Sequence, residues 1–290
     1  MGFIKHNFIT HYVINFFKKI KLNGLYGFSL YELFKLYFIG IIKGAISTRA
    51  SSISFSFFMA FFPFILFVLN LIPYFPIENF DMVFLSFVES MLPKESSVFF
   101  HDIFTDINSN KRSGLLSTTL IFSLILIGNG VNAVFGGFTD SYHVHYSRSL
   151  FKQYLYAVFV GLILVVVVLF AAVSSVLFDF LIKQSDSLIN YLKYIFLIII
   201  ALISFSSLYF FGTVQGRNLK FISPGSIMTT ILLFSTTYLF GLYIDNFSNY
   251  NELYGSIGAL IIMMLFIWIN SISLLLGFEL NVVIYKLKNH

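Results

Sequence analysis

The sequence predicts an all-α membrane protein built around six transmembrane helices, and three observations support that fold class: its composition, its apolar stretches and its charge distribution. Of the 290 residues, 58% are hydrophobic and 11% are charged. A soluble domain carries about 25% charged residues. The chain has too few charged side chains to cover a water-exposed surface, so we expect the lipid bilayer to surround it.

Six stretches are long and apolar enough to cross a bilayer, which takes roughly 20 residues. We place them at 50–72, 115–138, 154–180, 191–211, 224–244 and 255–284. Residues 50–285 then form one transmembrane domain that includes an extracytoplasmic loop, 73–114. A cytoplasmic basic segment, 1–49, precedes this domain, and a cytoplasmic tail, 286–290, follows it.

The charges predict the orientation of these spans. Of the 18 Lys and Arg residues, 13 fall before the first span, in the second and fourth connectors or in the tail, whereas ten of the 13 acidic residues fall on the other side. Lys and Arg concentrate on the cytoplasmic side of membrane proteins. Both termini are therefore expected in the cytoplasm, and the net charge of +5 reflects topology rather than nucleic-acid binding.

Two further helical segments are expected outside the spans. Between residues 28 and 47, apolar side chains recur at helical spacing among charged ones, which predicts an amphipathic helix in the membrane interface or, equally, a helix packed under the bundle. The loop 73–114 carries two apolar stripes and predicts a helical cap over the outer mouth. The stripes are Phe80, Val83, Phe84, Phe87, Val88 and Met91, and then Val98, Phe99, Ile103 and Ile107.

The first span combines a polar first half with an interior proline. Ser51, Ser52, Ser54 and Ser56 either line a path or allow close helix packing. Pro63 removes a backbone hydrogen bond and favours a kink, which we interpret as a hinge.

Glu279 is the most informative ionisable residue of the predicted spans, because it lies near the inner edge of the last one. A charge within a membrane helix needs a partner or a wet cavity. Arg49 is expected at a similar depth, so we predict an ion pair or a shared cavity. The pair has either a functional role or only locks the first and last helices together.

Other polar residues extend this candidate path. Asn270, Ser273, Gly277 and Asn281 share one face of the last span, either as helix–helix contacts or as a path wall. The remaining candidates are Thr229 and Thr237 on the fifth span and Asn129 and Asn132 near the end of the second.

Several kinds of chemistry lack support in the sequence. With no Cys and no HExxH motif, His143 and His145 do not make a convincing metal site, and no P-loop or GxSxG motif is present. Glu279 lacks a second embedded carboxylate for acid–base catalysis. We expect no enzyme, no metal, no cofactor and no nucleic-acid partner.

Several motifs resemble the YihY/virulence factor BrkB family of bacterial inner-membrane proteins, formerly mislabelled as ribonuclease BN. They are RASSISFSFFMAFFPFILF, NGVNAVFGGFTDSY, SPGSIMTTILLF, YNELYGSIGALIIMMLFIW and LLLGFELNVVI. The resemblance covers roughly residues 31–285 and implies six spans, an inner-membrane location, links to envelope resistance and, in some members, suspected transport of lipid-like molecules. The first motif departs from the family, with Ser-Ile-Ser-Phe where Ala-Leu-Ala-Tyr is usual.

The functional expectation is a transporter or flippase-like protein for an amphipathic envelope molecule, with membrane lipids as neighbours and a homo-oligomer as one assembly. The alternative is a scaffold that organises envelope assembly without transport. A scaffold predicts no continuous cavity between the helices and an apolar outer surface interrupted by a flat face of small residues. A transporter predicts a path lined in part by the region of Glu279.

Overall fold

The computed structural model describes residues 29–71, 80–89, 92, 94–109, 116–142, 144, 149–182, 187–213, 220–246 and 256–288. Within these ranges the regular elements are all α-helices, which confirms the all-α class. They are α2 (Leu30–Lys43), α3 (Ile46–Leu71), α4 (Phe80–Glu89), α5 (Lys94–Ser109), α6 (Leu116–Thr139), α7 (Leu150–Ile182), α8 (Ser187–Gly212), α9 (Pro224–Asn246) and α11 (Ser256–Lys288).

Five of these helices are long and apolar enough to cross a membrane. Their apolar segments are Ile121–Thr139, Leu150–Ser175, Tyr191–Gly212, Pro224–Ile244 and Gly258–Lys288. They correspond to the last five predicted spans. The first predicted span coincides with α3, a helix of 26 residues that continues through Pro63.

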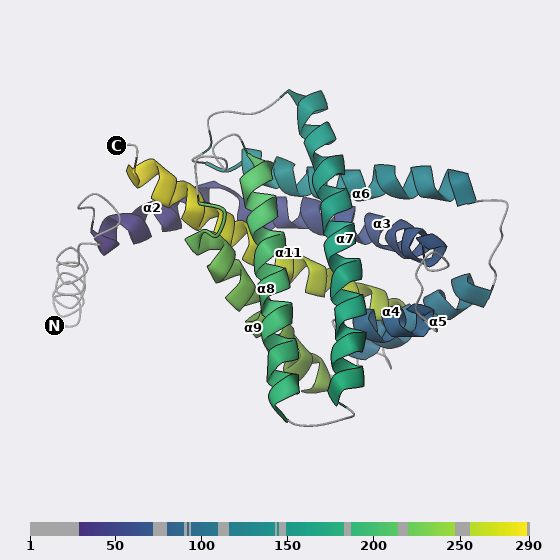
Figure 1. The fold of residues 1–290 in the computed structure, drawn as a ribbon. Helices are drawn as coiled ribbons and strands as arrows, with labels where there is room; N and C mark the ends of the chain where they lie inside the picture. Colours follow the sequence, from purple (N-terminus) through teal and green to yellow (C-terminus); the bar gives the residue numbers. More distant parts are fainter. Residues whose placement is uncertain are drawn as a thin grey trace.

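The long helices form two crossed groups (Figure 1). α3 and α6 lie side by side, and α7 and α8 run together steeply across them. α6 contacts α7 directly, and a second connection runs through α9, which packs along α11 and contacts α8, while α11 contacts α3. Membrane helices tilt by up to about 40° from the bilayer normal, so spanning helices tilted in opposite directions can cross steeply.

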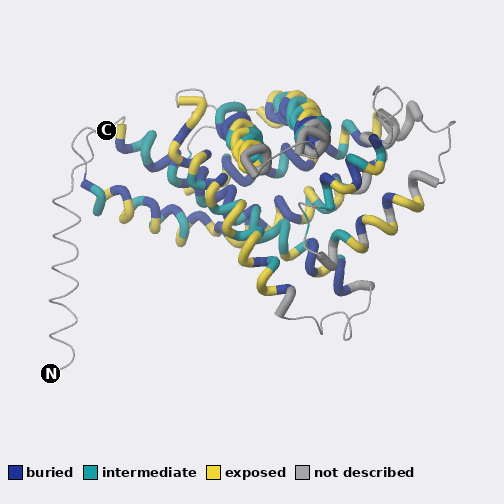
Figure 2. Tube along the Cα trace, turned by 60° about the horizontal axis from the view of Figure 1, so that its bottom comes forward, coloured by how far each residue is buried: buried dark blue, intermediate teal, exposed yellow. Residues whose placement is uncertain are grey.

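α2 begins at a capping box, and only a narrow face of it packs against the rest of the protein. The Ser29 side chain caps the helix and Glu32 bonds back to the Ser29 backbone. Leu33 and Tyr37 are buried against α11, whereas Phe34 and Phe38 are exposed, so buried and exposed positions alternate along α2 (Figure 2). The packing of one face of α2 against α11 agrees with the predicted helix under the bundle, and its position in the membrane interface stays a prediction.

The turn from α2 into α3 takes place at two small residues. Gly44 caps α2, and Ala45 has a positive φ of 46°. This left-handed conformation disfavours residues with a β-carbon. The turn reverses the chain tightly enough to bring the Arg49 guanidinium beside Gly44.

Two helices, α4 and α5, lie in the segment predicted as a helical cap, and the buried side chains of α4 follow the first predicted stripe. Phe80, Phe84 and Phe87 of α4 are buried. Among the described side chains of α5, Phe100 and Phe104 are buried and Val98 of the predicted stripe is 60% exposed, so this prediction was wrong for Val98. The side chains of Phe99, Ile103 and Ile107 lie outside the described residues. The reason is a tertiary one: Phe100 and Phe104 pack against Phe84 and the neighbouring helices, and this aromatic cluster sets the rotation of α5.

The core of the described residues contains two large hydrophobic clusters, besides two small ones on α2–α11 and α9–α11. The first surrounds Phe138 and Phe278, whose rings stack with centroids 4.2 Å apart. The second surrounds the α4–α5 phenylalanines and includes Leu169 and Ala172 of α7. The space between these clusters contains the cavity described below.

Candidate functional site

The predicted pair of Arg49 and Glu279 is present and deeply buried. Arg49 is the fourth residue of α3, and Glu279 lies in the last third of α11. The Arg49 Nη2 and the Glu279 Oε1 are 2.7 Å apart, and their side chains are 6% and 0% exposed. The charges compensate each other in a dry environment, which is the condition for retaining either of them there.

Further polar partners surround this ion pair. The Arg49 Nη1 donates a hydrogen bond of 2.8 Å to the carbonyl oxygen of Gly137, and the Ser141 hydroxyl donates one of 3.0 Å to the Glu279 Oε2. Gly44 leaves room for the guanidinium, because a β-carbon at Gly44 would lie 2.9 Å from Nη2. The pair therefore joins α3, the end of α6 and α11 in one network.

Tyr37 of α2 adds an uncharged donor on the same side of α11. Its hydroxyl donates a hydrogen bond of 3.2 Å to the Leu276 carbonyl. Burial, and then the negative charge of Glu279, raise the pKa of Tyr37 to about 12. The hydroxyl therefore stays protonated and keeps donating at any physiological pH.

Asn281 follows Glu279 in α11 with one residue between them, and its side chain caps the first turn of α9. Its Oδ1 accepts a hydrogen bond of 2.8 Å from the Gly225 N–H, and its Nδ2 donates one of 2.8 Å to the Ser223 hydroxyl. Ser223 and Ser226 also bond each other's backbone N–H groups with their hydroxyls. The first N–H groups of a helix lack partners within it, so α11 supplies one of those that α9 needs.

α9 and α11 approach each other closely at Gly277. A β-carbon on Gly277 would overlap the Thr229 Oγ1 and lie 2.6 Å from the Gly225 carbonyl oxygen. The Tyr209 hydroxyl of α8 contacts Thr229 and donates a hydrogen bond of 2.7 Å to the Leu274 carbonyl. Three helices therefore meet through a glycine, a threonine and a tyrosine.

The polar face predicted for the last span contacts α9 along its length. The Thr236 hydroxyl donates a hydrogen bond of 3.0 Å to the Asn270 Oδ1, and the Asn270 Nδ2 donates to the Phe266 carbonyl. With Gly277 and Asn281 at the same contact, this face corresponds to the helix–helix alternative. Asn270 and Ser273 also border the cavity described below, so their role as a path wall stays a prediction.

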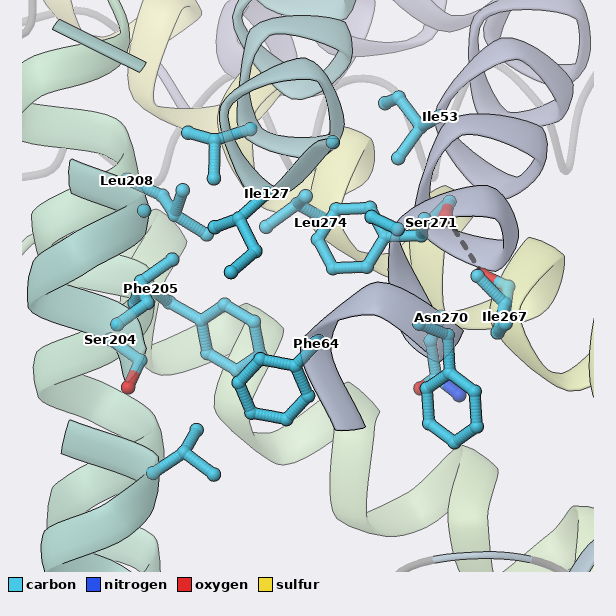
Figure 3. Close-up of a pocket in the computed structure, with 18 of the residues that line it drawn as sticks. Ile53, Phe64, Ile127, Ser204, Phe205, Leu208, Ile267, Asn270, Ser271 and Leu274 are labelled. Carbon is cyan, nitrogen blue, oxygen red and sulfur yellow. Dashed lines mark hydrogen bonds between the residues drawn. The ribbon is translucent and has the colours of Figure 1, made fainter. Parts of the chain in front are cut away.

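A cavity of about 450 Å³ lies between α3, α6, α7, α8, α9 and α11. Figure 3 shows Phe205 and Leu208 of α8 on one side and Asn270 and Ile267 of α11 on the other. Most of the lining is aliphatic or aromatic. The polar exceptions are Ser204, Thr229, Asn270, Ser271 and Ser273.

Most of these polar side chains already bond within the protein. The hydroxyls of Ser204, Ser271 and Ser273 donate to the backbone carbonyl four residues earlier. In Figure 3 the dashed line marks the bond from Ser271 to Ile267. The cavity therefore offers an apolar surface with a small polar area on its α9–α11 side.

The expectation that Glu279 and Arg49 border the path does not match the cavity, because neither residue lines it. Leu274 is the last lining residue of α11, and Glu279 lies five residues further, about 7.5 Å along the helix. The physical reason is compensation: Arg49, Ser141 and the packed Phe278 region keep the carboxylate away from any open volume.

The other predicted residues are dispersed. Asn129 is exposed on α6, Asn132 accepts a 3.2 Å hydrogen bond from Gln153 of α7, and Thr237 is half-buried. The side chain of Pro63 and the residues His143 and His145 lie outside the described residues. In the described part, no three His, Asp or Glu side chains gather into a metal-binding group.

Several residues that bond to the Arg49–Glu279 pair or connect α8, α9 and α11 were not identified from the sequence. Ser141 and Gly137 belong to the NGVNAVFGGFTDSY motif, so the motif itself was the available signal. Ser223 likewise begins the SPGSIMTTILLF motif, whereas Tyr209 carried no signal, because a single tyrosine in an apolar helix is common. Their roles depend on how α8, α9 and α11 cross.

This arrangement of long apolar helices around a buried ion pair defines a multi-pass membrane protein. The profile of the family described as Virulence factor BrkB matches residues 40–290. The chain therefore belongs to the virulence factor BrkB family, as its motifs predicted.

Two kinds of relative are similar to the chain. A Bacillus subtilis (strain 168) protein named as ribonuclease-like, YfkH, is 28% identical over 251 residues, which cover 83% of this chain and 90% of that protein. UPF0761 membrane proteins of Xanthomonas oryzae pv. oryzae (strain PXO99A) and Xanthomonas axonopodis pv. citri (strain 306) are each 36% identical over 63 residues, 22% of this chain and 15% of theirs. No solved structure matches the chain.

Proposed function

We propose that the protein is a transporter or flippase-like protein that moves an amphipathic, lipid-like envelope molecule across the bacterial inner membrane. The observation that carries the proposal is the cavity of about 450 Å³ between the long helices. Its volume falls within the roughly 300–1,000 Å³ of small-molecule pockets. Its apolar walls suit a hydrocarbon chain.

The polar part of the substrate would face the α9–α11 side of the cavity. Thr229 and Asn270 are the lining residues there whose polar atoms belong to side-chain networks between helices. A group that displaces the Thr236 bond to Asn270 would gain a carboxamide partner in an apolar environment, where hydrogen bonds are strong. Arg49 and Glu279 would hold the ends of α3, α6 and α11 in register around this site.

The scaffold alternative is less well supported. A protein that only organises other enzymes needs no internal volume, and interiors are normally packed with few voids larger than a water molecule. The half-open cavity between the helices favours a protein that accommodates a molecule. We assign no catalytic reaction to the site, because the carboxylate of Glu279 is occupied by Arg49 and Ser141.

A transport assay in liposomes tests this proposal with a cavity-filling variant. Leu164 lines the cavity, whereas Leu162 of the same helix faces outward and is 39% exposed. We expect reconstituted wild-type protein to move a fluorescent envelope lipid between leaflets. Leu164→Trp should reduce the rate to that of protein-free liposomes, since the indole occupies the volume, and Leu162→Trp should leave it unchanged.

Equal rates for the two tryptophan variants, or no movement of any envelope lipid by the wild-type protein, would contradict the proposal. Size-exclusion profiles of both variants provide the control for folding. A folded Leu164→Trp protein that transports normally would favour the scaffold.

We also propose that α3 crosses the membrane, which with the other five long helices makes six crossings, and that both termini are cytoplasmic. The chain contains no cysteine, so single cysteines report topology without background. In intact cells a membrane-impermeant maleimide should label Asp102→Cys of α5. It should label Lys43→Cys, Lys220→Cys and Lys288→Cys only after the membrane is opened. Labelling of Lys43→Cys and Asp102→Cys from the same side would show that α3 does not cross.

A further inference from the structure

The outward-facing surface of the apolar helices is interrupted at one residue of α6. Between their end turns, the exposed residues of the five apolar helices are aliphatic or aromatic, except Asn129 and Ser235 among the described residues. A serine hydroxyl can bond to the carbonyl of its own preceding turn. The carboxamide of asparagine has two donor hydrogens and an acceptor oxygen, so one such bond leaves it incomplete.

Asn129 lies in the middle of its helix. Leu116 precedes it by 13 residues and Thr139 follows it by ten, which places it about 15 Å or more from either end. No hydrogen bond joins its side chain to the described part of the protein. An amide without partners in hydrocarbon costs several kcal/mol, so this surface favours a protein partner over lipid tails.

The face around Asn129 has small residues as well. Gly136 lies two turns further along the same face, and a β-carbon there would meet no atom within 4 Å. Ala133 lies between them, and Ile125, 46% exposed, lies one turn before Asn129. Small residues allow the backbones of two membrane helices to approach closely, and polar side chains then bond between the helices.

We propose that Ile125, Asn129, Ala133 and Gly136 form a homodimer surface that binds the same surface of a second copy of this chain. Two copies inserted in the same orientation are related by a twofold axis along the membrane normal, which places identical residues opposite each other. A carboxamide is complementary to itself, since the amide of one Asn129 can donate to the oxygen of the other. A lipid headgroup is the less suitable partner, because headgroups lie at the ends of the helix and not at its middle.

Disulfide cross-linking tests this surface directly. In the naturally cysteine-free chain, Ile125→Cys should form a covalent dimer when the full-length protein is oxidised in membranes. Phe159→Cys, on the outward face of α7 and 53% exposed, serves as the matched control and should remain monomeric. Dilution into excess lipid before oxidation removes cross-links that arise from random collisions.

A second substitution assigns the contact to the carboxamide. Asn129→Leu in the Ile125→Cys background should lower the dimerisation equilibrium constant roughly tenfold, since interhelical polar contacts contribute about 1–2 kcal/mol. The change is measured as a lower dimer fraction at limiting protein density. Asn129→Gln should restore most of the dimer fraction. The proposal is overturned if Ile125→Cys cross-links no better than Phe159→Cys, or if Asn129→Leu leaves the dimer fraction unchanged. The dimer is independent of transport, so neither result depends on the liposome assay.

Discussion

Replacement of Glu279 by leucine is expected to destabilise the protein by about 3–5 kcal/mol, the range for breaking a buried ion pair from one side. The variant leaves the Arg49 guanidinium, only 6% exposed, without a counter-charge. Its Nε already has no hydrogen-bond partner among the described residues, so the positive charge would keep only the Gly137 carbonyl. Unfolding in mixed micelles, followed by circular dichroism, measures the loss.

The double variant Arg49→Leu/Glu279→Leu is the control for this prediction. Replacing both charges of a buried pair by apolar residues is often close to neutral. We therefore expect the double variant to regain most of the stability that the single variant loses. A double variant as unstable as Glu279→Leu would show that the carboxylate matters for another reason, and a single variant as stable as wild type would show that water or lipid reaches Arg49.

Gly277→Ala is expected to have the second-largest effect, a loss of about 3 kcal/mol, at the upper end of the usual range for overpacking. The added methyl group would overlap the Thr229 hydroxyl and lie 2.7 Å from the Tyr209 hydroxyl. Neither atom can withdraw easily, because Tyr209 is bonded to the Leu274 carbonyl and Thr229 is fixed between α8 and α11. We expect α9 and α11 to separate, with a lower melting temperature in detergent.

Gly241→Ala is the matched control for Gly277→Ala. Gly241 lies in α9, and a β-carbon there would meet no atom within 4 Å. Alanine stabilises a helix interior by about 0.5–1 kcal/mol relative to glycine. An unchanged or slightly raised melting temperature for Gly241→Ala, beside a clear fall for Gly277→Ala, would assign the loss to the helix contact. Equal shifts in the two variants would exclude that explanation.

The sequence predicted the elements of this fold better than their rotations. Composition and apolar length identify the long helices, and equal depth in the membrane was sufficient to pair Arg49 with Glu279. In α5, however, helical spacing alone did not distinguish Val98 from Phe100 and Phe104, because that choice depends on the aromatic partners in α4. Propensity and period contain no information about such tertiary contacts.

The candidate site illustrates the same limit at the level of single side chains. Thr237 was predicted on the polar face of the fifth span, whereas the hydroxyl that bonds to Asn270 belongs to Thr236. The path was expected to reach Glu279, whereas the cavity ends near Leu274. The first difference depends on how α9 packs along α11, and the second on the partners of Glu279, Arg49 and Ser141, neither of which one sequence can specify.

The ion pair and the cavity therefore have separate roles in this account. The pair joins α3, α6 and α11, and the cavity near it provides the apolar volume. Tyr209 connects the two regions, because it packs against Phe138 and Phe278 and bonds to Leu274 at the cavity wall.

The most direct test of the central claim is an experimental density map of the full chain in nanodiscs made from bacterial envelope lipids. We predict elongated density inside the cavity, along Phe64, Leu164 and Leu208, with its polar end towards Asn270. A cavity closed by its own side chains, or one that is open to lipid but contains no density, would contradict the claim.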